Sequence, residues 1–233
     1  MAAPSDSKPR AALSLVSQEH DLAFYTRHAG ERGSRLLLLG SANGRIAWSL
    51  AEDGHRVVAI DPSPLMIRSA EDRRSDEDPE TSERVRFLTA DLRSLRLTER
   101  FPLVLAPQHA LGLMPTRDDL EAMIATVRHH LEPTGTFIYD VLNPPPEPAR
   151  VDQPREPGGA YEPRRPVFAS HLRERGHAGK PGSIRRLKLT HFSFEEIDSA
   201  LATAGLSSQE RYGNFEGKPF DPEDARCVGV AGL

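Results

Sequence analysis

The sequence has 233 residues, which is enough for one α/β domain with an appendage and short for two full domains. Its 30 basic residues nearly balance its 34 acidic residues, and this argues against a general nucleic-acid binder, which usually carries a basic excess. A single cysteine, Cys227, excludes an intramolecular disulfide framework. Because no apolar stretch is long enough for a signal-peptide core or a transmembrane helix, we expect a cytoplasmic protein with no membrane partner.

Apolar runs and amphipathic segments alternate along the chain as far as the fifth predicted strand. We expect residues 1–16 to form a flexible tail and residues 17–29 a helix that stops at Gly30. Strands are predicted at residues 35–39, 56–61, 85–88, 103–106 and 136–141. Helices are predicted at residues 45–53, 63–73 and 116–131, the last ended by Pro133 and Gly135, while the charged run 71–84 indicates a solvated helix end and loop. This alternation predicts a parallel sheet wrapped by helices.

The composition changes after the fifth predicted strand. Eight of the 24 residues from Asn143 to Pro166 are proline, so this segment, with its "NPPP" at 143–146, is predicted as an extended connection. The sequences "VFASHLRER" and "SIRRLKLTHF", on either side of "GHAGKPG", favour a hairpin. Ser193 and Glu196 form a capping box that starts a helix ending before Gly205, and the last strands are predicted at residues 206–212 and 226–232.

The loop after the first predicted strand reads "GSANG" (40–44) and opens a helix. In a doubly wound sheet, such a loop lies at the carboxyl edge, where ligands bind. A dinucleotide fingerprint needs a third glycine where Arg45 stands, and a Walker loop needs a Gly-Lys pair, so neither pattern fits. An acid, Asp61, ends the second strand 17 residues after the loop.

This spacing, with further segments that match in the correct order, resembles class I S-adenosylmethionine-dependent methyltransferases of the small-molecule type. The segments include "GHRVVAIDPSPLMI", "VRFLTADLRSL", "FPLVLAPQHALGLM" and "HHLEPTGTFIYDVLNP". The resemblance implies a Rossmann-like, doubly wound α/β fold with a mostly parallel seven-stranded sheet, an antiparallel last strand and an insertion after the fifth strand. It implies a methyltransferase-like domain over residues 17–233, in which the insertion at residues 143–192 covers the acceptor site.

The resemblance also implies that S-adenosyl-L-methionine, released as S-adenosyl-L-homocysteine, is held at the ends of the first four strands. The implied cofactor-binding residues are Gly40, Ser41, Ala42, Gly44, Asp61, Pro62, Met66, Asp91, Leu92, Pro107 and Gln108. Asp61 has two acceptor oxygens for the ribose hydroxyls, and Asp91 is expected to accept from the adenine amine. His109, after the fourth strand, is the candidate catalytic base. The nine histidines show no metal-ligand spacing with Cys227 or paired acids, so no metal is predicted.

Two positions depart from the family's usual loop: Leu38 stands where an acid is usual, and Ala42 where a glycine is common. The leading hypothesis is an N- or O-methyltransferase that acts on a small molecule. The two departures support an alternative, a methyltransferase-like protein that has lost methyl transfer and binds the cofactor structurally, catalyses a different reaction or serves as a partner subunit. A nicotinamide-dependent oxidoreductase is disfavoured by the missing third glycine.

Structural roles stay open for three of the candidate residues. Asp61 is alternatively a cap at the end of its strand, Asp91 a turn residue, and His109 a packed or solvent-facing histidine. The sequence predicts neither the acceptor nor the oligomeric state.

Overall fold

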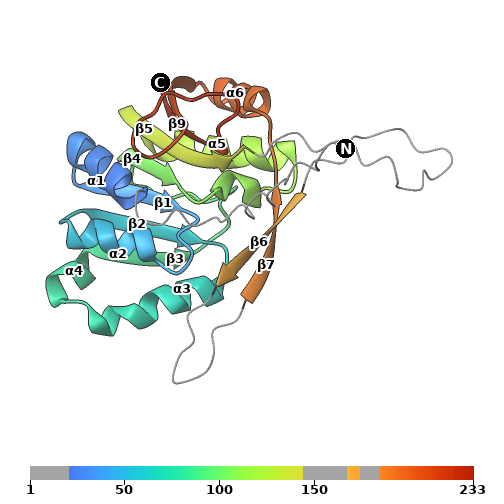
Figure 1. Ribbon diagram of the computed structural model, residues 1–233. Helices are drawn as coiled ribbons and strands as arrows, with labels where there is room; N and C mark the ends of the chain where they lie inside the picture. Colours follow the sequence, from blue (N-terminus) through green and yellow to red (C-terminus); the bar gives the residue numbers. More distant parts are fainter. Residues whose placement is uncertain (1–20, 144–166, 174–183) are drawn as a thin grey trace, which may run out of the picture.

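The computed structural model describes residues 21–143, 167–173 and 184–233, and for residues 167–173 and 184–188 it describes the backbone alone (Figure 1). The tail expected at residues 1–16 and nearly all of the proline-rich connection lie outside these described residues. The described strands form a seven-stranded sheet and a separate two-stranded sheet.

The seven-stranded sheet is mixed and mostly parallel, with the strand order β3-β2-β1-β4-β5-β9-β8. Its strands are β1 (Arg35–Leu39), β2 (Arg56–Asp61), β3 (Val85–Thr89), β4 (Phe101–Ala106), β5 (Leu131–Leu142), β8 (Ser207–Tyr212) and β9 (Arg226–Gly232). Strands β1 to β5 pair in parallel, whereas β9 is antiparallel to both of its neighbours, β5 and β8. The predicted doubly wound α/β fold with an antiparallel last strand is therefore confirmed.

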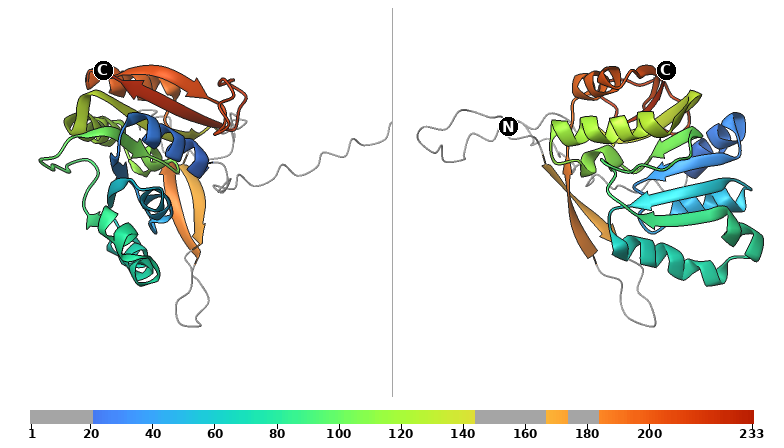
Figure 2. Two further views of the ribbon diagram at one scale, coloured as in Figure 1. Left: turned by 90° about the vertical axis from the view of Figure 1, so that its left-hand side faces the viewer. Right: turned by 180° about the vertical axis from the view of Figure 1, so that it is seen from behind.

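Helices cover both faces of this sheet (Figures 1 and 2). They are α1 (Asp21–Arg32), α2 (Arg45–Glu52), α3 (Pro64–Glu71), α4 (Pro79–Arg84), α5 (Arg117–His130) and α6 (Phe194–Thr203), with the 3-10 helices η1 (Asp72–Asp76) and η2 (Ala110–Leu113). The four leucines of β1 are fully buried and alternate between the faces, because successive side chains of a strand point to opposite sides. Leu36 and Leu38 join the cluster that contains residues of α1 and α2, and Leu37 and Leu39 join the cluster that contains residues of α5 and α6.

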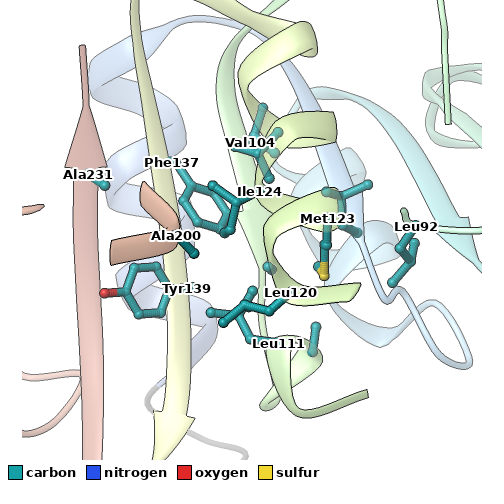
Figure 3. Close-up of a cluster of buried hydrophobic side chains, with 14 of the residues drawn as sticks. Leu92, Val104, Leu111, Leu120, Met123, Ile124, Phe137, Tyr139, Ala200 and Ala231 are labelled. Atoms are coloured by element: carbon teal, nitrogen blue, oxygen red, sulfur yellow. The ribbon is translucent and has the colours of Figure 1, made fainter. Parts of the chain in front are cut away.

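Figure 3 shows part of the second cluster, in which Leu120 and Ile124 of α5 lie together with Phe137 of β5. Burying one such side chain contributes about 1.5–3 kcal/mol, so this packing holds α5 firmly against the sheet. Helix α5 packs against both β4 and β5.

Side-chain caps define the starts of several helices as the sequence predicts. Ser63 Oγ accepts the N–H of Met66, with Pro64 in the first helical position. Ser193 Oγ accepts the N–H of Glu196, and the Glu196 carboxylate accepts the N–H of Ser193, which completes the predicted capping box.

Three expected boundaries are wrong. Helix α1 continues through Gly30 and ends before Gly33. Gly33 has a φ of +122°, a backbone conformation that favours glycine. The charged run 71–84 is more helical than expected, because the Asp78 side chain accepts the Thr81 N–H at 2.9 Å and caps α4. Helix α5 ends at His130, and Pro133 lies within β5; the residue before a proline favours an extended backbone.

The predicted hairpin is confirmed in its two strands, β6 (Val167–Arg173) and β7 (Ile184–Thr190), which pair antiparallel. Figures 1 and 2 show it standing at one end of the main sheet, across the direction of the strands, and β7 packs against η2. In the described part of the chain, no helix has the length and apolar character that crossing a membrane requires.

Candidate functional site

The loop between β1 and α2 has a left-handed backbone at Gly40 (φ +81°), Ala42 (φ +48°) and Gly44 (φ +79°). The N–H groups of Gly40 and Ser41 both donate to the carbonyl of Ile60, at 2.8 and 2.9 Å, and so fasten the loop to β2. A Cβ at Gly44 would lie 2.8 Å from the Cβ of Ala70, so this position has no room for a side chain. The loop is therefore compact, with its backbone open to close approach by a ligand.

Asp61 links this loop to the next one. One carboxylate oxygen accepts the Ala42 N–H at 2.9 Å and the other accepts the Ser63 N–H at 2.8 Å. The side chain is only 6% exposed, and burial raises its pKa although both N–H donors act in the opposite direction. Asp61 thus does cap the end of its strand, and its carboxylate lies at the carboxyl edge between the first and second loops.

A cleft of about 380 Å³ lies beside this edge, a volume within the range of small-molecule sites. It is lined by Pro62, Thr89, Ala90, Asp91, Leu92, Arg93, Leu113, Met114 and Pro115. Three of these residues, Pro62, Asp91 and Leu92, belong to the predicted cofactor set. Met66, also predicted, is buried in the first turn of α3.

Asp91 is paired with a cation that sequence reasoning missed. The Arg93 guanidinium donates to both carboxylate oxygens, at distances from 2.6 to 3.1 Å, and also to Asp119 at 2.6 Å. These hydrogen bonds lower the pKa of Asp91. The Asp91 and Arg93 side chains are 44% and 43% exposed, and an exposed pair of this kind contributes at most about 1 kcal/mol, so a ligand can compete for the carboxylate.

The loop after β4 contains Pro107, Gln108 and His109, and the last two have left-handed backbones with φ of +56° and +61°. The Gln108 N–H donates to Asp140 at 2.6 Å. The Leu142 N–H donates to His109 Nδ1 at 2.9 Å. This contact leaves the proton of the neutral imidazole on Nε2.

His109 is 1% exposed, and burial lowers its pKa to about 4. A general base needs an unprotonated nitrogen that faces the acceptor, whereas Nδ1 is already engaged by Leu142. The geometry thus favours the structural role that the sequence left open, and catalysis by His109 stays a prediction.

Sequence reasoning also missed a buried carboxylate in β5, Asp140. The signal was present, because Asp140 is an acid within the otherwise apolar run "TFIYDVL". It accepts from the Tyr25 hydroxyl at 2.8 Å and pairs with Arg226. Burial and the neighbouring Asp140 charge raise the pKa of Tyr25 well above its ordinary value.

The candidate residues gather at one edge of the sheet, because the carboxyl ends of β1 to β4 are neighbours in parallel register. Leu38 lies outside this group, since its side chain is fully buried in the apolar cluster between the sheet and α1 and α2. Among the described residues, no group of three or more His, Cys, Asp and Glu side chains is arranged to hold a metal ion.

Comparisons with known proteins find similarity to methyltransferases. Residues 36–135 match the methyltransferase domain family. The cypemycin N-terminal methyltransferase of a Streptomyces species is 29% identical over 123 residues, which cover 53% of this chain and 48% of that protein. The chain spans about half the length of the curated relatives it matches.

Solved structures share the fold over most of their length. The CcbJ methyltransferase from Streptomyces caelestis has a TM-score of 0.73 at 22% identity, covering 92% of this chain and 90% of that one. The glycopeptide N-methyltransferase MtfA, complexed with (S)-adenosyl-L-methionine, has a TM-score of 0.66 at 16% identity, covering 94% and 90%.

The family match falls on the segment that carries the loop after β1, Asp61 and Asp91. The match to the methyltransferase domain family and the fold shared with solved S-adenosylmethionine-dependent methyltransferases both agree with the resemblance predicted from the sequence. The MtfA structures with (S)-adenosyl-L-methionine and with (S)-adenosyl-L-homocysteine support S-adenosylmethionine as the cofactor.

Proposed function

We propose that this chain transfers the methyl group of S-adenosylmethionine to a nitrogen or oxygen of a small-molecule acceptor. The observation that carries the proposal is the buried Asp61 carboxylate, which lies next to a left-handed glycine loop and a cleft of about 380 Å³. The glycopeptide N-methyltransferase MtfA, which shares the fold, is named for transfer to nitrogen, and a relative is named as an N-terminal methyltransferase, so amines are the first acceptors to test.

The residues at the carboxyl edge are proposed to bind different parts of S-adenosylmethionine. In this proposal Asp61 accepts from the ribose hydroxyls, and Pro62, Asp91 and Leu92 flank the adenine in the cleft. The loop from Gly40 to Gly44 lies against the amino acid end, and its left-handed backbone allows close approach.

S-adenosylmethionine, when bound, supplies a methyl group that its sulfonium already activates, so the protein's main contribution is alignment and the exclusion of water. Pro107 and Gln108 of the loop after β4 are proposed to face the acceptor, and His109 to support that loop by packing. The insertion at residues 143–192 is proposed to cover the acceptor, which is consistent with the packing of β7 against η2. Transfer would form a carbon–nitrogen or carbon–oxygen bond on the acceptor and break the carbon–sulfur bond of S-adenosylmethionine, and the acceptor's proton would leave the site with the product.

Calorimetric titration with S-adenosylmethionine, S-adenosylhomocysteine and NAD tests the cofactor. We expect the two sulfur compounds to bind and Asp61→Ala to weaken that binding at least about tenfold, because hydrogen bonds to a charged group contribute about 1.5–3 kcal/mol each. Asp118→Ala, at an exposed acid in the first turn of α5, is the matched control and should bind as the wild type does. Binding of NAD alone, or unchanged affinity in a folded Asp61→Ala variant, would contradict the proposal.

Methyl transfer itself is tested with a panel of small amines and hydroxyl compounds, each product being checked by mass spectrometry for one added methyl group. The alternative, a protein that has lost methyl transfer, is favoured by a specific observation: Leu38 fills the acid's usual position with core. Cofactor binding without methylation of any acceptor in the panel supports that alternative.

A further inference from the structure

The buried carboxylate of Asp140 joins three separate parts of the chain. Its Oδ1 accepts both the Tyr25 hydroxyl of α1, at 2.8 Å, and the Gln108 N–H of the loop after β4, at 2.6 Å. Its Oδ2 pairs with Arg226 of β9. A carboxylate that is 1% exposed is expensive to bury unless its oxygens are hydrogen-bonded, and both oxygens of Asp140 are.

The loop that Asp140 contacts has an unusual backbone. Gln108 and His109 are consecutive non-glycine residues with φ of +56° and +61°. Side chains with a Cβ adopt this region only where surrounding contacts fix them, and such residues concentrate at functional sites.

Two residues of β5 supply these contacts. Asp140 accepts the Gln108 N–H, and the Leu142 N–H donates to His109 Nδ1 at 2.9 Å. The first contact is made by the Asp140 side chain and the second by the main chain of Leu142, so both fasten the loop after β4 to the carboxyl end of β5.

We propose that Asp140 is a positioning residue that, together with His109, clamps the Gln108–His109 backbone in its left-handed conformation and so fixes the acceptor side of the site. This inference rests on the proposed function, in which the loop after β4 faces the acceptor. Through the Tyr25 hydroxyl the clamp also connects α1 to that loop. Asp140 acts through Gln108 and does not line the cofactor cleft.

The clamp predicts different effects on transfer and on cofactor binding. Misplacing an acceptor contact by about 1 Å lowers a reaction rate by roughly a hundredfold. The hydrogen bonds that hold Asp61 and the loop after β1 do not involve Asp140. Loss of the clamp should therefore lower kcat/KM for the acceptor while leaving the affinity for S-adenosylmethionine nearly unchanged.

Two variants test the clamp on the full chain. Asp140→Asn replaces the carboxylate, and Tyr25→Phe removes a single donor from it and keeps the proposal testable where Asp140→Asn does not fold. Tyr139→Phe is the control, since it removes a hydroxyl from the neighbouring β5 residue, which belongs to the apolar cluster on the other face. Each variant is checked by thermal unfolding, by S-adenosylmethionine calorimetry and by acceptor kinetics.

The amide proton of Gln108 gives a readout that does not depend on activity. A short, charge-assisted N–H···O bond moves an amide resonance downfield and protects it from exchange. We expect the downfield, protected Gln108 amide in the wild type and in Tyr139→Phe. Its resonance should be altered in Tyr25→Phe, and the downfield shift and the protection should both be lost in Asp140→Asn.

For acceptor kcat/KM, we expect a fall of at least about tenfold in Asp140→Asn and about threefold in Tyr25→Phe, with cofactor Kd changed by less than about threefold. Folded variants with unchanged kcat/KM and an unchanged Gln108 amide would overturn the clamp. If the wild type binds S-adenosylmethionine but methylates nothing, the proposed function fails, and the amide signature alone decides whether Asp140 holds the loop.

Discussion

Leu38→Asp restores the acid that the family usually has, and the structure predicts that the restoration fails. Leu38 is the last residue but one of β1 and is fully buried, and it pairs with Ala59 of β2 and Leu105 of β4. Its cluster contains Phe24 of α1 and Trp48 of α2. Among the described residues, the neighbours of this side chain form an apolar layer, so a carboxylate at position 38 is buried in apolar surroundings.

The size of the effect follows from two contributions. Removing a buried leucine forfeits about 1.5–3 kcal/mol of hydrophobic stabilisation. Burying an unpaired carboxylate costs several kcal/mol more. The sum is at least about 5 kcal/mol, and a typical domain has only about 5–15 kcal/mol of unfolding free energy, so Leu38→Asp should be largely unfolded or melt far below the wild type.

Denaturant unfolding and calorimetry with S-adenosylmethionine measure both consequences. Leu38→Ala is the matched control, because it creates a cavity worth about 2–5 kcal/mol without adding a charge. The difference in unfolding free energy between the two variants measures the cost of burying the charge. This difference should decrease at low pH, where the buried carboxyl becomes neutral. A Leu38→Asp variant that is as stable as Leu38→Ala and binds S-adenosylmethionine more tightly would refute the reasoning, since position 38 would then face a wet cleft.

Two further predictions concern the loops. Ala42→Gly should leave the unfolding free energy unchanged or raise it by up to about 1 kcal/mol. The reason is that glycine removes the strain of a left-handed alanine backbone, and this gain offsets the greater entropy of glycine in the unfolded chain. A decrease of more than about 1 kcal/mol, measured by chemical denaturation, contradicts the φ of +48° at Ala42. Burial lowers the pKa of His109 from 6.5 to about 4. As the pH falls, the unfolded chain therefore takes up a proton at this residue before the folded chain does, and the unfolding free energy decreases between pH 6.5 and pH 4 by about 3 kcal/mol in total. His28 titrates in the same window, so the measurement is a difference: the unfolding free energy of His109→Asn should depend less steeply on pH than that of the wild type, and equal slopes argue against a buried neutral His109.

The sequence predicts those features that depend on local pattern. The apolar run of β1 and the capping box at Ser193 are decided by a few neighbouring residues, and both are confirmed. Helix α4 was missed because a highly charged segment resembles a loop until the Asp78 cap is recognised. The role of Asp140 was not predictable, since its partners Tyr25 and Arg226 lie 115 and 86 residues away in the sequence.

In the candidate site too, features set by local sequence could be predicted, and features set by contacts between distant or flexible groups could not. The position of Asp61 follows from the end of its strand and is confirmed, whereas its contact with the Ala42 N–H depends on how the loop folds back. The pairing of Asp91 with Arg93 joins residues two apart, yet the sequence does not show which way the arginine turns. The left-handed backbone at Gln108 and His109 is equally hidden, because few non-glycine residues adopt it and the sequence does not mark which ones do.

Position 38 and Asp61 differ in what they can offer to the proposed cofactor site. An ionised carboxylate has about four acceptor positions, and the Ala42 and Ser63 N–H groups occupy two of those on Asp61. Two positions remain, one on each oxygen, which is the number that a pair of ribose hydroxyls needs. Leu38, by contrast, packs into the apolar layer beside α1 and α2, so this side chain offers no charge to the amino acid end of a cofactor. In the proposed site, Asp61 therefore has the acceptor positions that the ribose hydroxyls need, whereas the side chain at position 38 takes no part in binding and stabilises the sheet that positions the loop after β1.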